Sequence, residues 1–137
     1  MNRQKLTKAF IVDDNTEAIE LLRRMLENNF SVTVAGTATD AESAASLIVK
    51  TEPDLIFLDV ELPTMSGLEF CTMIRNELKP ETKVVFYTGH DKYMLEAIRR
   101  QAFDYLMKPP TEQDLSQIMT RYWIFRIHRT PYNGCRQ

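Results

Sequence analysis

Residues 55–63 read Leu-Ile-Phe-Leu-Asp-Val-Glu-Leu-Pro, and the predicted fold depends on this stretch. Its four leading apolar residues are too few for a helix, and an unbroken apolar run of this length is typical of a strand buried on both faces. Such a strand lies in the middle of a parallel sheet. The run ends in Asp59, and ligands of open α/β sheets bind at the carboxyl ends of the strands. We therefore expect Asp59 to be either a capping residue or a reactive group.

Apolar runs and helical patterns alternate along the rest of the chain. Short apolar or β-branched runs predict strands at residues 9–12, 31–37, 55–58, 83–88 and 104–108. The helices that follow are predicted to begin at Asn15-Thr16, Thr39-x-x-Glu42, Ser66-x-x-Glu69, Lys92 and Thr111-x-x-Asp114. This alternation predicts right-handed crossovers and helices on both faces of the sheet. The predicted fold class is α/β, a doubly wound (βα)5 sheet of parallel strands in the flavodoxin-like order 2-1-3-4-5.

The bulk composition indicates a soluble globular protein of one domain. Of its 137 residues, 44% are hydrophobic and 26% charged, and the net charge of −2 gives no overall attraction to nucleic acid or lipid. The two cysteines, Cys71 and Cys135, lack metal-ligand spacing, which argues against a disulfide framework or a zinc site. We find no signal peptide in residues 1–8 and no transmembrane run, so the predicted location is cytoplasmic.

Polar side chains of useful types follow four of the five predicted strands. They are Asp13, Asp14, Asp59, Thr88 and Lys108. Strands one and three are neighbours in a doubly wound sheet, so the three carboxylates are expected to converge. Two such charges 4 Å apart cost about 4 kcal/mol at an effective dielectric of 20, and an all-oxygen site that offsets this cost suits Mg²⁺ or Mn²⁺. A lysine and a hydroxyl opposite the metal complete a cradle for a phosphoryl group, which Asp59 is able to attack as a nucleophile.

Each of these residues also has a plainer interpretation when it is taken alone. The Asp13-Asp14 pair is equally well explained as charge at a helix N-terminus. Thr88 alone is more often a strand residue, and Lys108 alone a solvated strand end. The joint placement of all five at one edge of one sheet is what favours a site.

On these residues the chain resembles the receiver domain of two-component response regulators, over residues 8 to 122. The resemblance rests on Asp13-Asp14, on Asp59 within Leu-Asp-Val-Glu-Leu-Pro-Thr-Met-Ser-Gly, on Thr88 and on Lys108-Pro109. It implies that Asp59 accepts phosphate from a histidine kinase. It implies that Asp14, Asp59 and the backbone carbonyl of Glu61 bind Mg²⁺, with Asp13 acting through water.

The resemblance also implies a switch. Thr88, Gly89 and Lys108 would contact the phosphate, and Thr88 would turn toward it while Tyr105 packs inward. The face made by helix 4, strand 5 and helix 5 would then meet an output domain or a homodimer partner. Two flanking residues, Glu61 and His90, would tune the loss of phosphate. The plainer interpretation of Tyr105 is edge-strand packing, and that of His90 is an exposed loop residue.

The segment from Thr88 to Pro109 is similar to receivers of the LytTR class, whose output half binds DNA. That half is absent from these 137 residues, so nucleic acid would be bound only through a missing domain. Residues 1–122 are the expected receiver domain, and residues 123–137 are either a helical overrun and tail or the start of a linker. This end of the chain carries basic residues, among them Arg126 and Arg136, with apolar residues such as Trp123 and Ile127.

Other functions remain open from the residues alone. A stand-alone receiver would act by protein–protein contact without an output domain. A phosphatase of the haloacid dehalogenase type would also use an aspartyl nucleophile, but it requires a second aspartate where this chain has Glu61. A flavin carrier on this fold would be repelled by Asp13-Asp14. We expect no enzyme activity beyond slow self-dephosphorylation.

Overall fold

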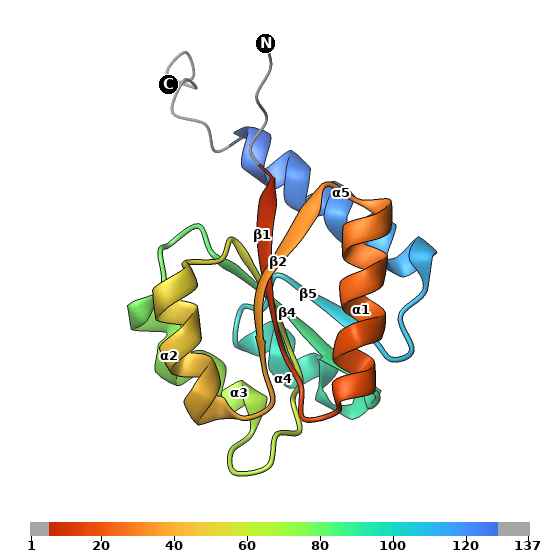
Figure 1. The fold of residues 1–137 in the computed structure, drawn as a ribbon. Helices are drawn as coiled ribbons and strands as arrows, with labels where there is room; N and C mark the ends of the chain where they lie inside the picture. Colours follow the sequence, from red (N-terminus) through yellow and green to blue (C-terminus); the bar gives the residue numbers. More distant parts are fainter. Residues whose placement is uncertain (1–5, 129–137) are drawn as a thin grey trace.

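The computed structural model describes residues 6–128, which form a five-stranded sheet with its connecting helices (Figure 1). The strands are β1 (Thr7–Val12), β2 (Val32–Ala38), β3 (Leu55–Leu58), β4 (Lys83–Thr88) and β5 (Asp104–Met107). The helices are α1 (Thr16–Asn29), α2 (Ala41–Thr51), α3 (Gly67–Ile74), α4 (Met94–Arg99) and α5 (Glu112–His128). Two short 3-10 helices precede or follow these elements, η1 (Arg75–Glu77) and η2 (Asp91–Tyr93).

The sheet has the predicted topology. Its strands lie in the order β2-β1-β3-β4-β5, and every pair is parallel. The central strand β3 is at most 1% exposed at any residue, as the opening apolar run predicts. The predicted α/β fold class is therefore confirmed, and the carboxyl ends of β1, β3 and β4 meet at one edge.

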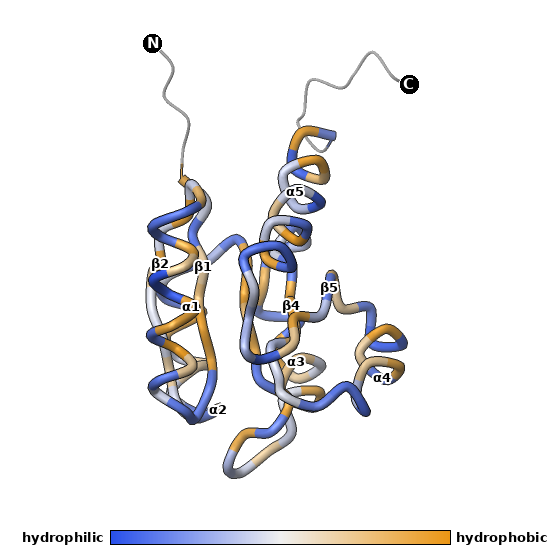
Figure 2. The backbone as a smooth tube through the Cα atoms, turned by 90° about the vertical axis from the view of Figure 1, so that its right-hand side faces the viewer, coloured by the Kyte–Doolittle hydropathy of each residue, from blue (hydrophilic) through white to orange (hydrophobic). Residues whose placement is uncertain are grey.

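Helices cover both faces of the sheet. Figure 1 shows α1 and α5 on one side and α2 and α3 on the other. Each side has its own core, one of them built around Phe10, Phe70 and Phe86 and the other around Phe57, Tyr87 and Tyr122. The strands β1 and β4 are hydrophobic along most of their length, whereas the loops around them are polar (Figure 2).

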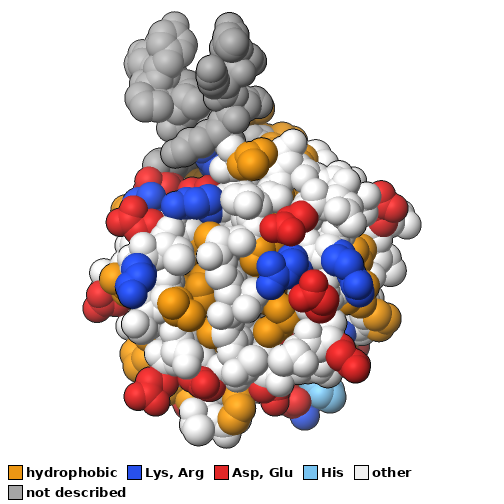
Figure 3. Space-filling view, in the orientation of Figure 1, with side chains coloured by type: hydrophobic (Ala, Val, Ile, Leu, Met, Phe, Trp, Pro, Cys, Tyr) orange, Lys and Arg blue, Asp and Glu red, His pale blue; other side chains and the backbone are white. Residues whose placement is uncertain are grey.

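The outer surface shows no concentration of one charge on the face that carries the edge strand β2. Acidic and basic side chains are interspersed there, as a net charge of −2 would suggest (Figure 3). Among residues 6–128, no helix has both the length and the apolar character that crossing a membrane requires.

Several local predictions need correction. The second helix is capped by Asp40, whose carboxylate accepts a hydrogen bond from the Ser43 amide at 2.7 Å, and not by Thr39. The third helix ends as a 3-10 turn at Glu77, because Leu78 is already extended.

The last helix continues beyond the predicted receiver boundary. Its first turn is capped by Thr111, whose hydroxyl accepts a hydrogen bond from the Asp114 amide at 3.0 Å. It reaches His128, and the side chains of Trp123 and Phe125 pack against the core on the α1–α5 side. This agrees with the interpretation of an overrunning helix. The remaining tail, residues 129–137 with Cys135 and Arg136, lies outside the described residues.

Candidate functional site

The three predicted carboxylates meet where β1 and β3 end. The backbone holds them there, because the Asp13 amide donates to Ala38 of β2 at 3.0 Å and the Asp59 amide donates to Val12 of β1 at 2.9 Å. One carboxylate oxygen each from Asp13, Asp14 and Asp59 lies within 4.8 Å of the others. Asp13 is fully buried and Asp59 is 5% exposed, whereas Asp14 faces solvent. We call these three residues and Lys108 the acidic site.

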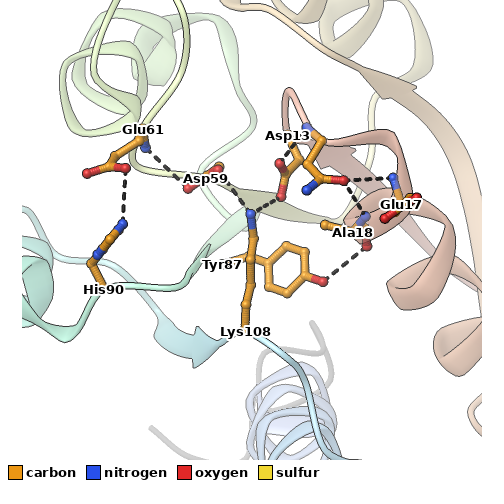
Figure 4. Close-up of polar contacts among 9 residues, drawn as sticks. Asp13, Glu17, Ala18, Asp59, Glu61, Tyr87, His90 and Lys108 are labelled. Atoms are coloured by element: carbon orange, nitrogen blue, oxygen red, sulfur yellow. Dashed lines mark hydrogen bonds and ion pairs between the residues drawn. The ribbon is translucent and has the colours of Figure 1, made fainter.

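Lys108 reaches this site from the end of β5. Its Nζ lies 2.6 Å from Asp13 Oδ2 and 3.1 Å from Asp59 Oδ2, so that it joins the two buried carboxylates (Figure 4). Burial works against its charge, but the bonds to Asp13 and Asp59 outweigh burial and raise the pKa of Lys108. Burial also raises the pKa of Asp13, although Lys108 opposes the effect. The single lysine therefore does not fully compensate the acidic site.

The residues at this site fit a hard divalent cation. All ligand atoms that they offer are oxygens, and two of the three carboxylates, those of Asp13 and Asp59, are buried. Burial raises the pKa of Asp13 despite Lys108, so its charge is incompletely compensated. Within residues 6–128, the Oδ2 atom of Asp13 is paired with the ammonium group of Lys108 alone, at 2.6 Å, and Lys108 is shared with Asp59. Because buried charges require a partner, a cation beside Asp13, Asp14 and Asp59 is consistent with the donor set.

Thr88 lies at the end of β4 with its hydroxyl buried. The side chain is fully buried, and Oγ1 has no hydrogen-bond partner within residues 6–128. A buried hydroxyl without a partner costs free energy, so an acceptor is expected to come to it in another state of the protein. The next residue, Gly89, is exposed, and a Cβ placed on it would meet nothing within 4 Å.

A second group of polar contacts links the two loops beside the acidic site. The Glu61 carboxylate accepts a hydrogen bond from the Tyr93 hydroxyl at 2.7 Å and lies 3.2 Å from His90 Nε2. The Tyr93 hydrogen bond is the main reason why the pKa of Glu61 is lowered. The Glu61 amide donates to Asp59 Oδ1 at 3.2 Å. The predicted tuning residues, Glu61 and His90, are thus in contact with each other on one side of the acidic site (Figure 4).

Tyr105, the predicted switch residue, is half-buried on β5. Its hydroxyl donates a hydrogen bond to the His90 carbonyl, and its ring packs against the core on the α2–α3 side. It therefore connects β5 to the loop that follows Thr88.

Sequence reasoning missed two residues that build this site. Tyr87 is fully buried, its hydroxyl donates to the Ala18 carbonyl in α1 at 3.0 Å, and its ring lies 5.1 Å from Lys108 Nζ (Figure 4). A Cβ on Gly67 would lie 2.0 Å from the Asp59 carbonyl oxygen, so only glycine fits there. The available signal for Tyr87 was a residue with a polar end directly before Thr88 on an otherwise apolar strand.

Comparison with known proteins identifies the family. The family model of the response regulator receiver domain matches residues 9–120. The chain belongs to this family. Receiver domains are phosphoacceptors that work with histidine kinases and output domains, and they are not enzymes in the usual sense. The haloacid dehalogenase and flavin-carrier interpretations are thereby set aside.

Several relatives are full response regulators. The transcriptional regulatory protein BtsR of Salmonella typhi is 37% identical over 116 residues, which is 85% of this chain and 48% of that protein. The sensory transduction protein LytT of Bacillus anthracis is 32% identical over 117 residues, 85% of this chain and 47% of that protein. The chain therefore spans about half the length of the curated relatives it matches.

Solved receiver structures share the fold. The REC domain of AraT, a response regulator from Geobacillus stearothermophilus, superposes with a TM-score of 0.80 at 31% identity, covering 92% of this chain and all of that one. A CheY-like receiver domain protein from Methanospirillum hungatei gives a TM-score of 0.77 at 24% identity and supports the fold alone.

Proposed function

We propose that Asp59 accepts a phosphoryl group from a sensor histidine kinase while Mg²⁺ or Mn²⁺ is bound beside it. The observation that carries this proposal is the convergence of three carboxylate oxygens within 4.8 Å of one another, with Asp13 and Asp59 also paired with the ammonium group of Lys108. Asp59 is the member of this group that lies 5% exposed at the end of the central strand, so its carboxylate is held in a fixed position.

The metal ligands in this proposal are Asp14, Asp59 and the backbone carbonyl of Glu61, with Asp13 acting through a water molecule. When bound, the cation would screen the carboxylates from the incoming phosphoryl oxygens. Support comes from the oxygen-only donor set and from the buried, incompletely compensated charge of Asp13.

In the transfer step, a carboxylate oxygen of Asp59 attacks phosphorus and forms an O–P bond. The P–N bond to the kinase histidine breaks, and its electron pair stays on the imidazole. Lys108, already 3.1 Å from Asp59, would pair with the phosphoryl oxygens. The Thr88 hydroxyl would donate a hydrogen bond to one of these oxygens, and Gly89 leaves the approach open.

Phosphorylation would then act as a switch. Movement of Thr88 toward the phosphoryl group would alter the loop that Tyr105 holds through the His90 carbonyl. The α4–β5–α5 face would change shape and meet an output domain or a second copy of the chain. Leu95 and Ile98 of α4 are 59% and 64% exposed, so this face offers apolar side chains to such a partner. A shift from mostly inactive to mostly active needs about 5.5 kcal/mol of differential stabilisation.

Glu61 and His90 would set the lifetime of the acyl phosphate, because they contact each other and the Glu61 amide is bonded to the Asp59 carboxylate. Any self-dephosphorylation is expected to be slow.

The output is proposed to be transcriptional, through a DNA-binding domain that these residues do not contain. Support comes from relatives such as BtsR, which is named a transcriptional regulatory protein. The chain matches about half of the length of that protein. Residues 1–122 would be the receiver and residues 123–137 a tail or the start of a linker. Phosphotransfer from a histidine kinase implies a cytoplasmic location.

The test is incubation of the protein with a small phosphodonor such as acetyl phosphate, with Mg²⁺ or with EDTA. Intact mass spectrometry should detect one added phosphoryl group on the wild-type protein with Mg²⁺, and none in EDTA or on Asp59→Asn. Equal labelling of Asp59→Asn would refute the proposal. Folding of the variant is checked by circular dichroism.

A further inference from the structure

A cavity of about 570 Å³ lies between α3 and α4, at the other end of β4 from Thr88. The separation along the strand is about 17 Å, from five residues at about 3.3 Å each. Its volume is in the range of small-molecule sites. The polar and reactive side chains on its wall are those of Cys71, Thr72, Arg75, Asn76, Arg100 and Gln101.

The charge on this wall is positive. Within residues 6–128, no aspartate or glutamate lines the cavity. Lys83 also borders it, but its ammonium group lies 4.6 Å from the centre of the Phe125 ring, which belongs to the α1–α5 side of the sheet. The positive charge that faces the cavity therefore comes from Arg75 and Arg100.

Arg75 is half-buried and has no carboxylate partner. Its Nη1 donates to the Thr82 carbonyl at 3.2 Å, and no acid of residues 6–128 lies within ion-pair distance of it. A guanidinium group has five N–H donors in a planar fork, so most of the donors of Arg75 remain available. A half-buried cation of this kind is more stable when an anion is beside it.

Arg100 approaches the same place from α4. Its Nε donates to Glu96 at 2.8 Å, and its Nη1 donates to the Thr72 hydroxyl at 2.8 Å and to the Leu68 carbonyl at 3.2 Å. Cys71, Arg75 and Arg100 all line this cavity. Burial raises the pKa of the Cys71 thiol, and the positive charges of Arg75 and Arg100 oppose that rise. With one carboxylate for two arginines, the wall keeps a positive excess.

We propose that this cavity, here called the arginine cavity, binds the phosphoryl group of a small phosphomonoester between Arg75 and Arg100. A phosphomonoester carries close to two negative charges and three acceptor oxygens, which suit two guanidinium forks. The amides of Asn76 and Gln101 are placed to bind hydroxyl groups on the rest of the molecule.

The position of Arg100 gives such binding a consequence. Its contacts with Thr72 and Leu68 attach the end of α4 to α3, which lie side by side in Figure 1. An anion that holds Arg100 in place would keep this attachment and limit movement of α4. That consequence rests on the proposed switch, whereas the binding itself does not.

The test is a titration of the metal-free, ¹⁵N-labelled protein with glycerol 3-phosphate, followed by amide NMR shifts. EDTA is present throughout, so that the uncompensated carboxylates of the acidic site repel the anion. We expect saturable shifts at Thr72, Asn76 and Gln101 with a Kd of about 1 mM or tighter, weaker binding of acetate and none of neutral glycerol. Inorganic phosphate serves as a probe of the phosphoryl group alone.

Arg75→Gln is the main variant, because the Arg75 side chain has no carboxylate partner within residues 6–128 and contacts only the Thr82 carbonyl and the Cys71 thiol there. It should weaken the binding at least tenfold, and Arg75→Lys should give an intermediate affinity. The control is Arg99→Gln, which changes an exposed arginine next to Arg100 and should leave the Kd unchanged.

Three results would each overturn the proposal. They are unchanged affinity in Arg75→Gln, absence of saturable shifts with all phosphate probes, and shifts confined to Asp59 and Lys108. Because no phosphodonor is used, failure here leaves phosphorylation of Asp59 untouched.

Discussion

Two sites of opposite charge lie at the two ends of β4, and their residues come together in different ways. At its carboxyl end, Thr88 faces an acidic site made of residues that directly follow strands. At its amino end, the arginine cavity is made of side chains from separate helical turns. Strand ends bring the first group together for any sequence with this topology. The second group depends on how α3 and α4 pack, which the strand order alone does not determine.

The largest expected effect comes from Gly67, where the acidic site has no spare room. In Gly67→Ala the new methyl group would meet the Asp59 carbonyl oxygen at 2.0 Å, so the backbone of one loop has to move. Such overpacking costs about 1–3 kcal/mol or more, and it displaces Asp59 as well. We expect a lower melting temperature and loss of phosphorylation by acetyl phosphate.

The matched control for this change is Gly89→Ala. A methyl group there meets nothing within 4 Å, and the backbone φ of Gly89 is not positive. The melting temperature should stay at the wild-type value, and a fall as large as that in Gly67→Ala would contradict the geometry.

The second-largest expected effect concerns the buried negative charge of Asp13. It tests whether the acidic site needs a cation, in contrast to the arginine cavity, which is proposed to bind an anion. In EDTA, Asp13→Asn should raise the melting temperature by about 4 °C, because it removes a buried charge that its surroundings disfavour. Wild-type protein should be stabilised by about 2.7 kcal/mol when Mg²⁺ exceeds its Kd a hundredfold, and the variant by less. Calorimetry with and without Mg²⁺ measures both. An Asp13→Asn protein that is less stable than wild type in EDTA would contradict this charge assignment.

A related and smaller effect is the pH dependence of the metal-free protein. Burial raises the folded-state pKa of Asp13 above its ordinary value of 3.8, so between these two values the folded state binds more protons than the unfolded state. The free energy of unfolding therefore falls as pH rises through this window, and the loss is complete above the folded pKa. Urea unfolding of wild type and Asp13→Asn across acidic pH should show this slope in the difference between them. A difference that is independent of pH would be inconsistent with the shift.

The smallest expected effect is that of Tyr87→Phe, which tests how α1 and β4 are joined. The change removes the hydrogen bond to Ala18 and keeps the ring beside Lys108, at a cost of about 1 kcal/mol. We expect weaker Mg²⁺ binding, because α1 follows directly on Asp13 and Asp14, with little change in the phosphorylation rate at saturating Mg²⁺. Tyr87→Leu also removes the ring and should slow phosphorylation even when Mg²⁺ is saturating. Identical Mg²⁺ dependence in all three proteins would limit Tyr87 to a role in packing.

Much of the fold and the core of the acidic site were predictable from the sequence. The apolar run of β3 and the alternation of elements fixed the topology, and the topology alone brought Asp13, Asp14, Asp59 and Lys108 together. The choice of Asp40 over Thr39 as a helix cap was not predictable, since both residues accept hydrogen bonds and stand side by side.

The contacts made by Gly67, Tyr87 and Arg75 could not be predicted from the sequence, for a different reason. Each one depends on the distance between two separate elements, such as the close approach of the Asp59 carbonyl after β3 to Gly67 at the start of α3. Periodicity indicates which face of an element is buried, but it does not give the atom that the side chain meets.

The central claim is that Asp59 carries the phosphoryl group while its neighbours bind the metal, and it is tested most directly by locating the label. Protein treated with acetyl phosphate and Mg²⁺ is reduced with borohydride, which converts an acyl phosphate to an alcohol, and its peptides are then sequenced by mass spectrometry. We predict reduction at Asp59 alone, with Asp13 and Asp14 unchanged. Reduction at Asp13 or Asp14, or at none of the three, would contradict the account.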